Sequence, residues 1–466
     1  MKNRLFKTCV VFLISILLVS CGTFGADDLE PKEINSEPSH GSSAHLPDET
    51  RGLSLSIVKT PGMLFDNTIA SSNGLYKLRT DHGGTSVLYY DYSTMSLNYL
   101  SNQLIATTSD ENPGWIPSDE GGTVPAINGD YLYVVTVGLR SVGGSGGEPA
   151  KVFRMALDGS DRKDLTLPQS MLLNQNSGIV ADENGIYLLM DTYDAEERAY
   201  GDFVLLYVNS KMEKAEEIAR FPNNVFALNL YGAIGKELIF RVARPQEGYE
   251  EASRNEQFMH LRYAYVSYDI ETHSEKQLIQ YNQGEYSISY DYGNNLYYCK
   301  VGENDIHRID ITSKNDEIVL RADDILSLTG KETVRVYDSI IDDKIGVVTS
   351  VDEPYEVHQY YYDLITGDLY EPDMVFYEDD VEHPVRIIAE TFDRYVVING
   401  YIYYTEIDTI DGMPAETTRI EKYFSMIDKD DYWKNEPNYE SFTDYVYPSD
   451  AEIKSQYSHK AQGPGY

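Results

Sequence analysis

The feature that most constrains this chain is a cassette of short apolar runs and tight turns that recurs along it. The clearest copy begins with the turn Asn128-Gly129-Asp130, continues through two strand-like runs, 131–136 and 151–157, and reaches a hairpin turn at Asp158-Gly159-Ser160. Tyr, Val, Phe and Thr favour strands, and Asn-Gly or Asp-Gly favours hairpins. One such sheet has two apolar faces and cannot bury both alone. Copies are therefore predicted to stack face to face.

Seven copies align on the apolar residue that follows the first turn. These anchor residues are Leu75, Leu132, Ile186, Leu238, Leu296, Ile345 and Ile402, and subtraction gives spacings of 57, 54, 52, 58, 49 and 57 residues. Propeller repeats are ~40–50 residues long with four strands each. The sequence therefore predicts an all-β fold, a seven-bladed β-propeller with four-stranded antiparallel blades. Two open sandwiches are the rival fold, but they have no reason to repeat at this period.

The run at residues 53–58 alternates like a strand. A propeller commonly closes when one terminus completes the blade formed by the other, which removes exposed strand edges. We therefore expect this N-terminal strand to join the last blade near residues 442–447.

The N-terminus has the features of an export signal. Lys2, Arg4 and Lys7 precede an apolar run at 10–19, which is too short for a comfortable membrane span of ~20 residues. The end of this segment, Leu18-Val19-Ser20-Cys21-Gly22, resembles the bacterial lipobox, which implies lipidation at Cys21. A plain signal peptide with a chance cysteine is the alternative.

These features predict four regions. Residues 1–20 are the lipoprotein signal peptide, and 21–52, rich in Ser, Pro, Asp and Glu, are the lipid-anchor Cys and a disordered tether. Residues 53–450 are the propeller domain, and 451–466 are a flexible C-terminal tail.

Charge and cysteine content exclude several function classes. The net charge is −38, and removal of a signal with three positive charges leaves 35 minus 76, or −41. Such a surface repels nucleic-acid phosphates, so no nucleic-acid partner is expected. After removal of Cys9 with the signal and lipidation of Cys21, Cys299 is the only free thiol, so no intrachain disulfide is expected. Because Cys299 lies in a predicted strand, a buried apolar role is favoured over a reactive thiol.

No catalytic constellation stands out. Residues 143–147 match the Gly-x-Ser-x-Gly pattern, but they lie in a Gly/Ser loop with no helix after it. The nine histidines show no zinc-motif spacing, and no metal or cofactor is expected. The acidic runs 378–383 and 191–202 could offer oxygens to calcium, although a solvated acidic loop is the better interpretation.

Trp115, in a Pro- and Gly-containing loop, is the candidate ligand contact. The alternative is that its ring packs against the end of the propeller.

The predicted topology places the long connections on one face. In a four-stranded meander, the link between strands two and three and the link to the next blade leave at the same end. The long segments at these links are 138–150, 191–202, 243–262, 406–417, 101–123 and 371–384. Functional loops concentrate where a rigid scaffold presents them, so this insertion-rich face is the candidate binding surface.

The cassette, as in Asn128-Gly129-Asp130-Tyr131-Leu132-Tyr133 followed by residues 153–160, resembles the TolB-like propeller repeat, in the tyrosine-rich version of bacterial surface lipoproteins. The resemblance spans about 64–447 and departs from the pattern at Gly346, where an aromatic residue is usual. It implies a fold and no catalytic residues.

Three functional hypotheses follow from these observations. The first is a monomeric lipoprotein, anchored to the cell membrane on its extracytoplasmic side, that binds a protein, peptide or glycan. The second is an envelope-associated lyase or hydrolase acting on a polysaccharide at the channel mouth. A weaker third is a sensor subunit that works beside a membrane protein.

Overall fold

A computed structural model of the protein describes residues 54–442, except 62–66, 82–83, 101–111, 118–121, 139–147, 195–198, 291–294, 304, 331–332, 353–354, 379 and 411–412. The chain divides into two compact units, Met1–Ser43 and Ala44–Tyr466. The first unit, Cys21, the loop at 143–147 and the predicted boundaries at 52 and 450 all lie outside the described residues. No helix in the described ranges is long and apolar enough to cross a bilayer.

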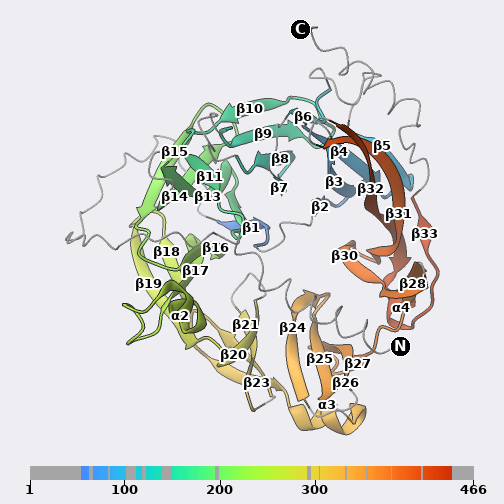
Figure 1. The fold of residues 1–466 in the computed structure, drawn as a ribbon. Coiled ribbons are helices and arrows are strands. Elements are labelled where there is room, and N and C mark those ends of the chain that lie inside the picture. Colours follow the sequence, from blue (N-terminus) through green and yellow to red (C-terminus); the bar gives the residue numbers. More distant parts are fainter. Residues whose placement is uncertain are drawn as a thin grey trace. The chain divides into compact units, whose positions relative to one another are not determined.

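The second unit is the predicted seven-bladed β-propeller with four-stranded antiparallel blades (Figure 1). Blade 1 contains β2 (Thr68–Ala70), β3 (Gly74–Asp81), β4 (Gly84–Asp91) and β5 (Ser96–Tyr99), and β6 (Trp115–Pro117) also pairs with β4. Blade 2 contains β7 (Thr123–Asn128), β8 (Tyr131–Thr136), β9 (Lys151–Ala156) and β10 (Lys163–Thr166). Blade 3 contains β12 (Ile179–Asp182), β13 (Gly185–Asp194), β14 (Ala199–Asn209) and β15 (Ala215–Phe221), and β11 (Met171–Leu173) pairs with β13.

The remaining blades follow the same order from inner to outer strand. Blade 4 contains β16 (Ala227–Ile234), β17 (Glu237–Pro245), β18 (Leu261–Asp269) and β19 (Ser274–Asn282), with α2 (Arg254–Met259) between β17 and β18. Blade 5 contains β20 (Tyr286–Tyr290), β21 (Asn295–Lys300), β22 (Ile306–Asp310) and β23 (Asp316–Leu320), and α3 (Ala322–Thr329) leads to blade 6. Blade 6 contains β24 (Thr333–Ile341), β25 (Lys344–Asp352), β26 (Tyr355–Asp363) and β27 (Leu369–Tyr370). A hairpin of β28 (Val375–Glu378) and β29 (Val381–Pro384) precedes blade 7, which contains β30 (Arg386–Glu390), β31 (Arg394–Ile410), β32 (Met413–Asp428) and β33 (Glu440–Ser441), with α4 (Lys429–Trp433) between β32 and β33.

Six of the seven predicted anchors occupy the same place, the second residue of the second strand of a blade. The prediction of Ile402 as the seventh anchor is wrong. Asn399 and Gly400 do not form a hairpin turn; they lie at an irregularity inside β31, and Ile402 is in register with Glu421. The true turn is at Phe392-Asp393, so the equivalent anchor is Tyr395, which is fully buried.

The predicted closure of the last blade by the N-terminal strand is also wrong. β1 (Ser56–Lys59) pairs with β12, the inner strand of blade 3, and blade 7 takes its outer strand, β33, from the C-terminal part of the chain. The alternating pattern explains this position, because Leu55 is buried among residues of blades 3 and 4. The inner edge of β12 offers unpaired backbone groups that an extra strand can satisfy. Side chains of blades 1 and 7, including Tyr90, Phe424 and Phe442, close the ring.

The repeated Asp after the third strand has a local structural role. Asp91, Asp269, Asp310 and Asp363 each accept hydrogen bonds from the backbone N–H groups two and three residues later, at 2.8–3.2 Å. A side chain that bonds its own following backbone in this way fixes a turn. The same turn therefore joins the third and fourth strands in these blades.

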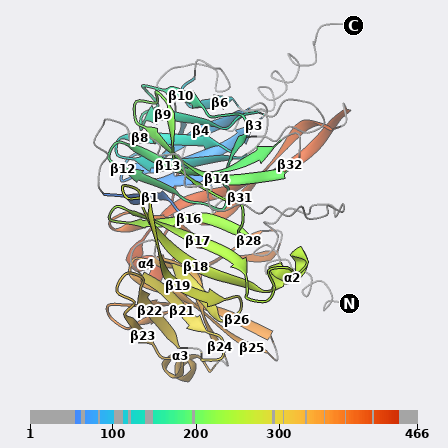
Figure 2. The same ribbon diagram turned by 90° about the vertical axis from the view of Figure 1, so that its left-hand side faces the viewer.

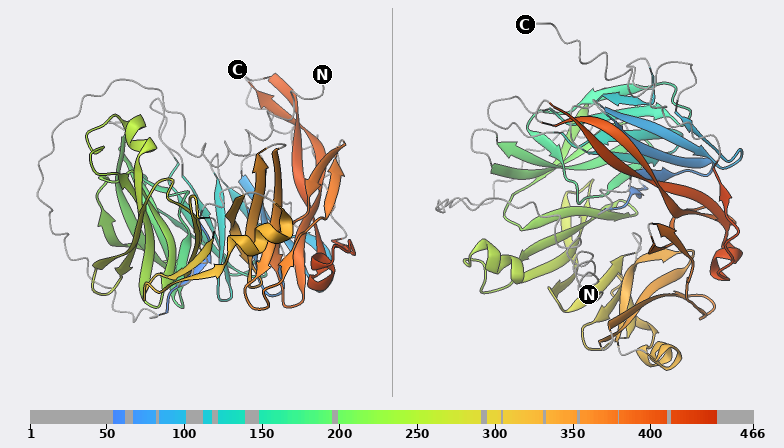
Figure 3. Two further views of the ribbon diagram at one scale, coloured as in Figure 1. Left: turned by 90° about the horizontal axis from the view of Figure 1, so that it is seen from below. Right: turned by 45° about the vertical axis from the view of Figure 1, so that its right-hand side comes forward.

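The described parts of the long connections that can be located lie on one side of the ring, as the topology predicts (Figure 2). Segment 191–202 extends β13 and β14 as a hairpin in which Asp194 is opposite Ala199, and segment 406–417 does the same for β31 and β32. Figure 2 shows the tip of β32, α2 and β28 on the same side of the molecule, and Figure 3 shows this side from two further directions. We call this side the insertion-rich face.

Candidate functional site: a charged pocket between blades 7 and 1

The site emerges from a comparison of equivalent positions in the seven blades. The residue two positions after each anchor faces the preceding blade and is buried. In blades 2 to 7 it is uncharged: Val134, Leu188, Phe240, Tyr298, Val347 and Val397. In blade 1 it is Lys77, which is only 8% exposed. A buried cation in an otherwise apolar seam is costly, because desolvation opposes it. Its presence distinguishes this strand position in blade 1 from the equivalent position in the other six blades.

Lys77 obtains a partner from the neighbouring blade. Its Nζ donates to Glu421 of β32, and the amine lies 5.2 Å from the centre of the Phe424 ring. Both side chains of the pair are mostly buried, with 10% and 17% of their surface exposed. The pair joins two strands that are far apart in sequence, and it lies on the surface where the last blade meets the first.

Two further cations lie beside this pair. Arg79 follows Lys77 on the same face of β3 and is 6% exposed, and its Nη2 donates to the Tyr99 hydroxyl at 2.7 Å. Lys422 comes from β32. Arg79, Lys77, Lys422 and Glu421 together carry a formal charge of two positive, although the chain carries −38. This local excess of positive charge would favour an anion in the pocket.

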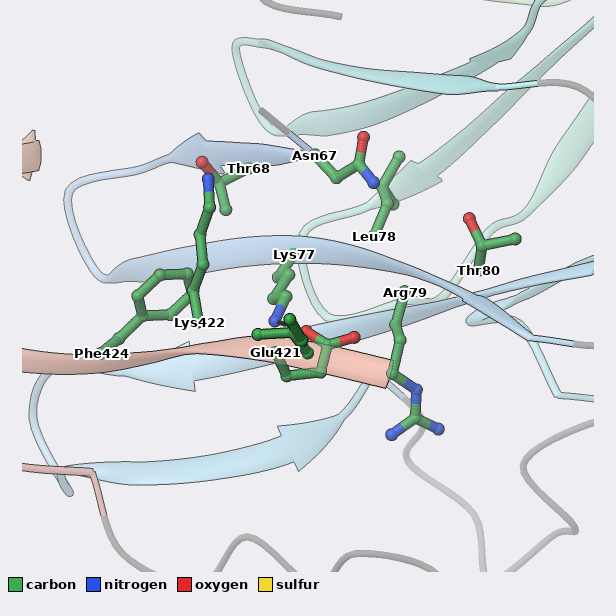
Figure 4. Close-up of a pocket in the computed structure, with 10 residues that line it drawn as sticks. Asn67, Thr68, Lys77, Leu78, Arg79, Thr80, Glu421, Lys422 and Phe424 are labelled. Atoms are coloured by element: carbon green, nitrogen blue, oxygen red, sulfur yellow. Dashed lines mark hydrogen bonds and ion pairs between the residues drawn. The ribbon is translucent and has the colours of Figure 1, made fainter. Parts of the chain in front are cut away.

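A pocket of about 330 Å³ opens between these residues (Figure 4). Figure 4 shows Lys77 and Glu421 pointing toward one another across the gap between β3 and β32, with Arg79 and Lys422 extending in other directions from the pair. Thr68, Thr80 and the exposed Ile420 complete the wall. The pocket lies in the half of β3 that leads to the β3–β4 link, which is the half nearest the insertion-rich face.

Burial and the neighbouring carboxylate act on Lys77 in opposite directions. Burial lowers the pKa of the Lys77 amine, while the carboxylate of Glu421 opposes this change. Lys77, Arg79 and Lys422 all line the pocket and are hydrogen-bond donors that an anionic group could use.

Two other pockets lie at blade seams. One, of about 370 Å³, is lined by residues of blades 1 and 2, including Tyr89 and Asp158. The other, of about 400 Å³, is lined by residues of blades 3 and 4, including Arg244 and Glu275. Neither brings together three cations. The charged seam between blades 7 and 1 is therefore the candidate site.

Trp115 does not lie in an exposed loop. It is 4% exposed and belongs to β6, where it is opposite Ser86 of β4. Arg162 Nη1 donates to its carbonyl oxygen at 2.5 Å. Its indole covers Gly84 so closely that a Cβ there would be 2.5 Å from the ring. The burial of Trp115 agrees with the alternative that its ring packs against the propeller. Because the ring is not exposed, it is no longer a candidate ligand contact.

The structure also places those other candidate residues that lie in the described part of the chain. Cys299 is buried in β21, as expected. Residues 378 and 381 lie on either side of the β28–β29 turn, with 379 outside the description. Among the described residues, no group of three or more His, Cys, Asp or Glu side chains is arranged to hold a metal ion.

The sequence analysis did not identify three residues of this site, Lys77, Arg79 and Glu421. For the first two, the sequence does contain a pattern that could have revealed them. Alignment of the cassettes places Lys77 and Arg79 in columns occupied by apolar or uncharged residues in most other copies. Glu421 could not be found in this way, because its alignment depended on the misplaced seventh anchor.

Comparisons with known proteins give the fold alone. No protein-family model matches the chain, and no curated protein matches it. Among solved structures, the chain is similar to a puromycin hydrolase mutant, with 10% identity and a TM-score of 0.44 over 82% of this chain and 54% of that one. It is similar to a prolyl endopeptidase, with 10% identity and a TM-score of 0.40 over 82% of this chain and 55% of that one. The chain thus spans about half the length of these two proteins. An oligogalacturonate lyase in complex with manganese matches with 11% identity and a TM-score of 0.38, over 82% of this chain and 88% of that one. At these identities and scores the likeness gives no indication of function.

Proposed function

We propose that this protein is a lipid-anchored binding module on the extracytoplasmic side of the cell membrane, which holds an acidic group of its protein, peptide or glycan ligand in the pocket between blades 7 and 1. The observation that carries the proposal is the presence of Lys77 and Arg79 where most other blades have uncharged residues. The lipobox around Cys21 and the resemblance to TolB-like surface lipoproteins support the location.

A binding role agrees with the composition of the pocket. Its one carboxylate, Glu421, is already paired with Lys77, whereas acid–base hydrolysis of a glycoside ordinarily needs two carboxylates. Cations and hydrogen-bond donors around an open space are what recognition of an anion requires.

The binding test uses the full chain in detergent and an array of peptides and glycans. We expect the hits to carry acidic groups. Arg79→Gln and Lys422→Gln should each weaken the strongest hit by about tenfold, as for the loss of one charge-assisted hydrogen bond. Lys236→Gln is the matched control, because Lys236 is an exposed cation paired with Glu271 and Asp269 elsewhere. Hits that are neutral, or that bind both pocket variants as well as the wild type, would refute this site.

The anchor is tested separately. In cells, we expect the wild type in the membrane fraction with incorporated fatty acid, and Cys21→Ala outside that fraction. A Cys21→Ala variant that still fractionates with the membrane would contradict the lipid anchor while leaving the pocket untouched.

A second candidate is an envelope lyase that acts on an acidic polysaccharide. One observation favours it: Lys77 has a lowered pKa, which suits a general base, and Arg79 could neutralise the substrate carboxylate beside it. The array ligands should then give an unsaturated product with ultraviolet absorbance, and Lys77→Met should abolish it. Binding without product formation would favour the first proposal.

A further inference from the structure

A pocket of about 400 Å³ lies at the seam between blades 3 and 4, and it shares no residue with the pocket between blades 7 and 1. Its base is apolar, because Leu228, Phe240 and Val242 of blade 4 are buried there and belong to the core of the seam. Phe221 of β15 and Val225 of the link between the blades pack against the same core and are only partly buried. The packed core therefore holds this apolar surface in place before any ligand binds.

Three aromatic rings line one part of this pocket. The centre of the Phe221 ring lies 5.2 Å from that of Phe240 and 5.5 Å from that of Tyr268, and the last two are 6.3 Å apart. The Tyr268 hydroxyl is hydrogen-bonded to His273 Nδ1 at 2.7 Å, so this hydroxyl is already satisfied. A surface of rings and aliphatic groups at a partly open site suits an apolar side chain of a ligand.

Four exposed polar side chains surround the apolar surface: Asn224, Arg244, Glu275 and Gln277. Among the described residues, none of the four takes part in a side-chain hydrogen bond or an ion pair. Another exposed cation of blade 4, Lys236, is by contrast paired with Glu271 and Asp269. The charges and amides at this pocket are therefore available to a ligand, which has only water to displace.

The two charges lie far apart along the strands of blade 4. Arg244 is in register with Arg262 of β18, and Glu275 is in register with Tyr268 of the same strand. Residue 268 minus residue 262 is six residues, or about 20 Å of strand. A free amino acid or a single sugar is too short to reach both charges, whereas an extended peptide of about six residues spans them.

An amide side chain between the two charges also favours a peptide. Gln277 of β19 is in register with Val266, which lies between Arg262 and Tyr268 on β18. An amide both donates and accepts hydrogen bonds, so Gln277 can bond to the N–H or C=O group of a peptide backbone. A hydrocarbon ligand would use none of the four polar side chains.

We propose that the pocket between blades 3 and 4 binds an extended peptide segment of about six residues, with an apolar side chain near its middle and opposite charges at its ends. The apolar side chain enters among the rings of Phe221, Phe240 and Tyr268, where burial supplies most of the affinity. An acidic residue pairs with Arg244 and a basic residue with Glu275. Exposed pairs of this kind are weak, and they mainly set the direction of the peptide. This site is separate from the pocket between blades 7 and 1 and does not rest on the proposed function.

The test is calorimetric titration of the full chain in detergent with end-blocked hexapeptides. Each peptide has glutamate at one end and lysine at the other, in either order, and either phenylalanine and leucine or two serines in the middle. Peptides with the apolar middle should bind at least about tenfold more tightly than those with serines, because only they bury apolar surface in the pocket. One order of the charges should bind about tenfold more tightly than the other, because in the wrong order like charges face each other.

Substitutions at the two charges locate the bound peptide. Arg244→Gln should weaken the tighter peptide about threefold, and the double variant with Glu275→Gln should bind both orders equally. Arg262→Gln is the matched control, because Arg262 is in register with Arg244 but does not line the pocket. Arg79→Gln should also leave binding unchanged, which separates this site from the pocket between blades 7 and 1.

The substituted charges of this site are exposed, so the variants should change the unfolding free energy little, and a loss of binding reports the contact itself. The proposal is wrong if no peptide binds, if peptides with serines bind as tightly as those with the apolar middle, or if the double variant keeps the wild-type preference for one order. Binding that is lost in Arg79→Gln and kept in the double variant would place the peptide in the other pocket and would also overturn it.

Discussion

The seam between blades 2 and 3 and the seam between blades 7 and 1 use the same strand positions in opposite ways. At the first, Ile186, Leu188 and Met190 are fully buried against blade 2. At the second, the column begins with the apolar Leu75 but continues with Lys77 and Arg79. Burial of apolar area stabilises the ring, whereas the burial of charge costs free energy even when the charge is paired. The difference teaches that apolar contacts hold the ring together at the first seam, whereas the second also contains charges whose burial is offset by pairing.

Loss of the Trp115 ring should have the largest effect. Trp115→Ala removes a side chain that is 4% exposed, and a buried Trp→Ala change costs about 3–5 kcal/mol. Urea denaturation measures it, with Phe392→Ala as the control because Phe392 is fully exposed. If Trp115→Ala keeps the wild-type unfolding free energy but loses ligand binding, Trp115 is a ligand contact after all.

At the apolar seam, Leu188→Ala should lower the unfolding free energy by about 3 kcal/mol, because the cavity between blades 2 and 3 cannot refill. Ile365→Ala is the matched control, since Ile365 is 75% exposed and should change the free energy by less than about 0.5 kcal/mol. Similar effects for the two variants would mean that this seam does not hold the ring together.

At the charged seam, Glu421→Leu should cost about 3 kcal/mol, because it leaves the Lys77 amine buried without its partner. The control is Glu271→Leu, which breaks the more exposed pair with Lys236 and should cost less than about 1 kcal/mol. Denaturation curves of the two variants distinguish a buried pair from a surface one. Equal costs would show that solvent reaches Lys77 freely.

The Asp turns should have the smallest effect, and it should depend on pH. Hydrogen bonds from the Ser313 backbone and the Thr312 side chain lower the pKa of Asp310 to about 2. A group whose pKa is lowered by folding contributes stability above its unfolded pKa, and loses it as pH falls through the folded value. Asp310→Asn should therefore cost about 0.5 kcal/mol near pH 6, a figure discounted for solvent screening, and nothing near pH 2. Urea curves at the two pH values test this, and a cost that grows in acid would reverse the assignment.

The fold could be predicted from the sequence because its signals are local. Turns such as Asn128-Gly129 fix hairpins, and the anchors Leu75 to Ile345 repeat because each blade needs the same apolar contact. The prediction of the seventh anchor was wrong for a physical reason. β31 is a long strand with an irregularity at Asn399-Gly400. In the sequence, an Asn-Gly pair at such an irregularity looks the same as an Asn-Gly hairpin turn. The predicted position of β1 was wrong because a short alternating run shows that a segment is a strand, but it does not show which distant strand it pairs with.

The site was less predictable than the fold. Trp115 lies in a loop-like sequence but is buried by β4 and Gly84, which only the tertiary structure reveals. Lys77 and Glu421 meet across the closure of the ring, separated by almost the whole domain. A charged residue in an apolar column is visible in the sequence only after the blades have been aligned correctly.

The most direct test of the proposed binding role of this seam is the double variant Lys77→Met with Glu421→Leu, which replaces the ion pair between blades 7 and 1 with apolar side chains. We predict that its unfolding free energy stays within about 1 kcal/mol of the wild type, because apolar residues can replace a buried ion pair without loss, and that it no longer binds the strongest acidic hit of the ligand array. A double variant that unfolds, or one that is stable and still binds the acidic ligand with wild-type affinity, would contradict this account.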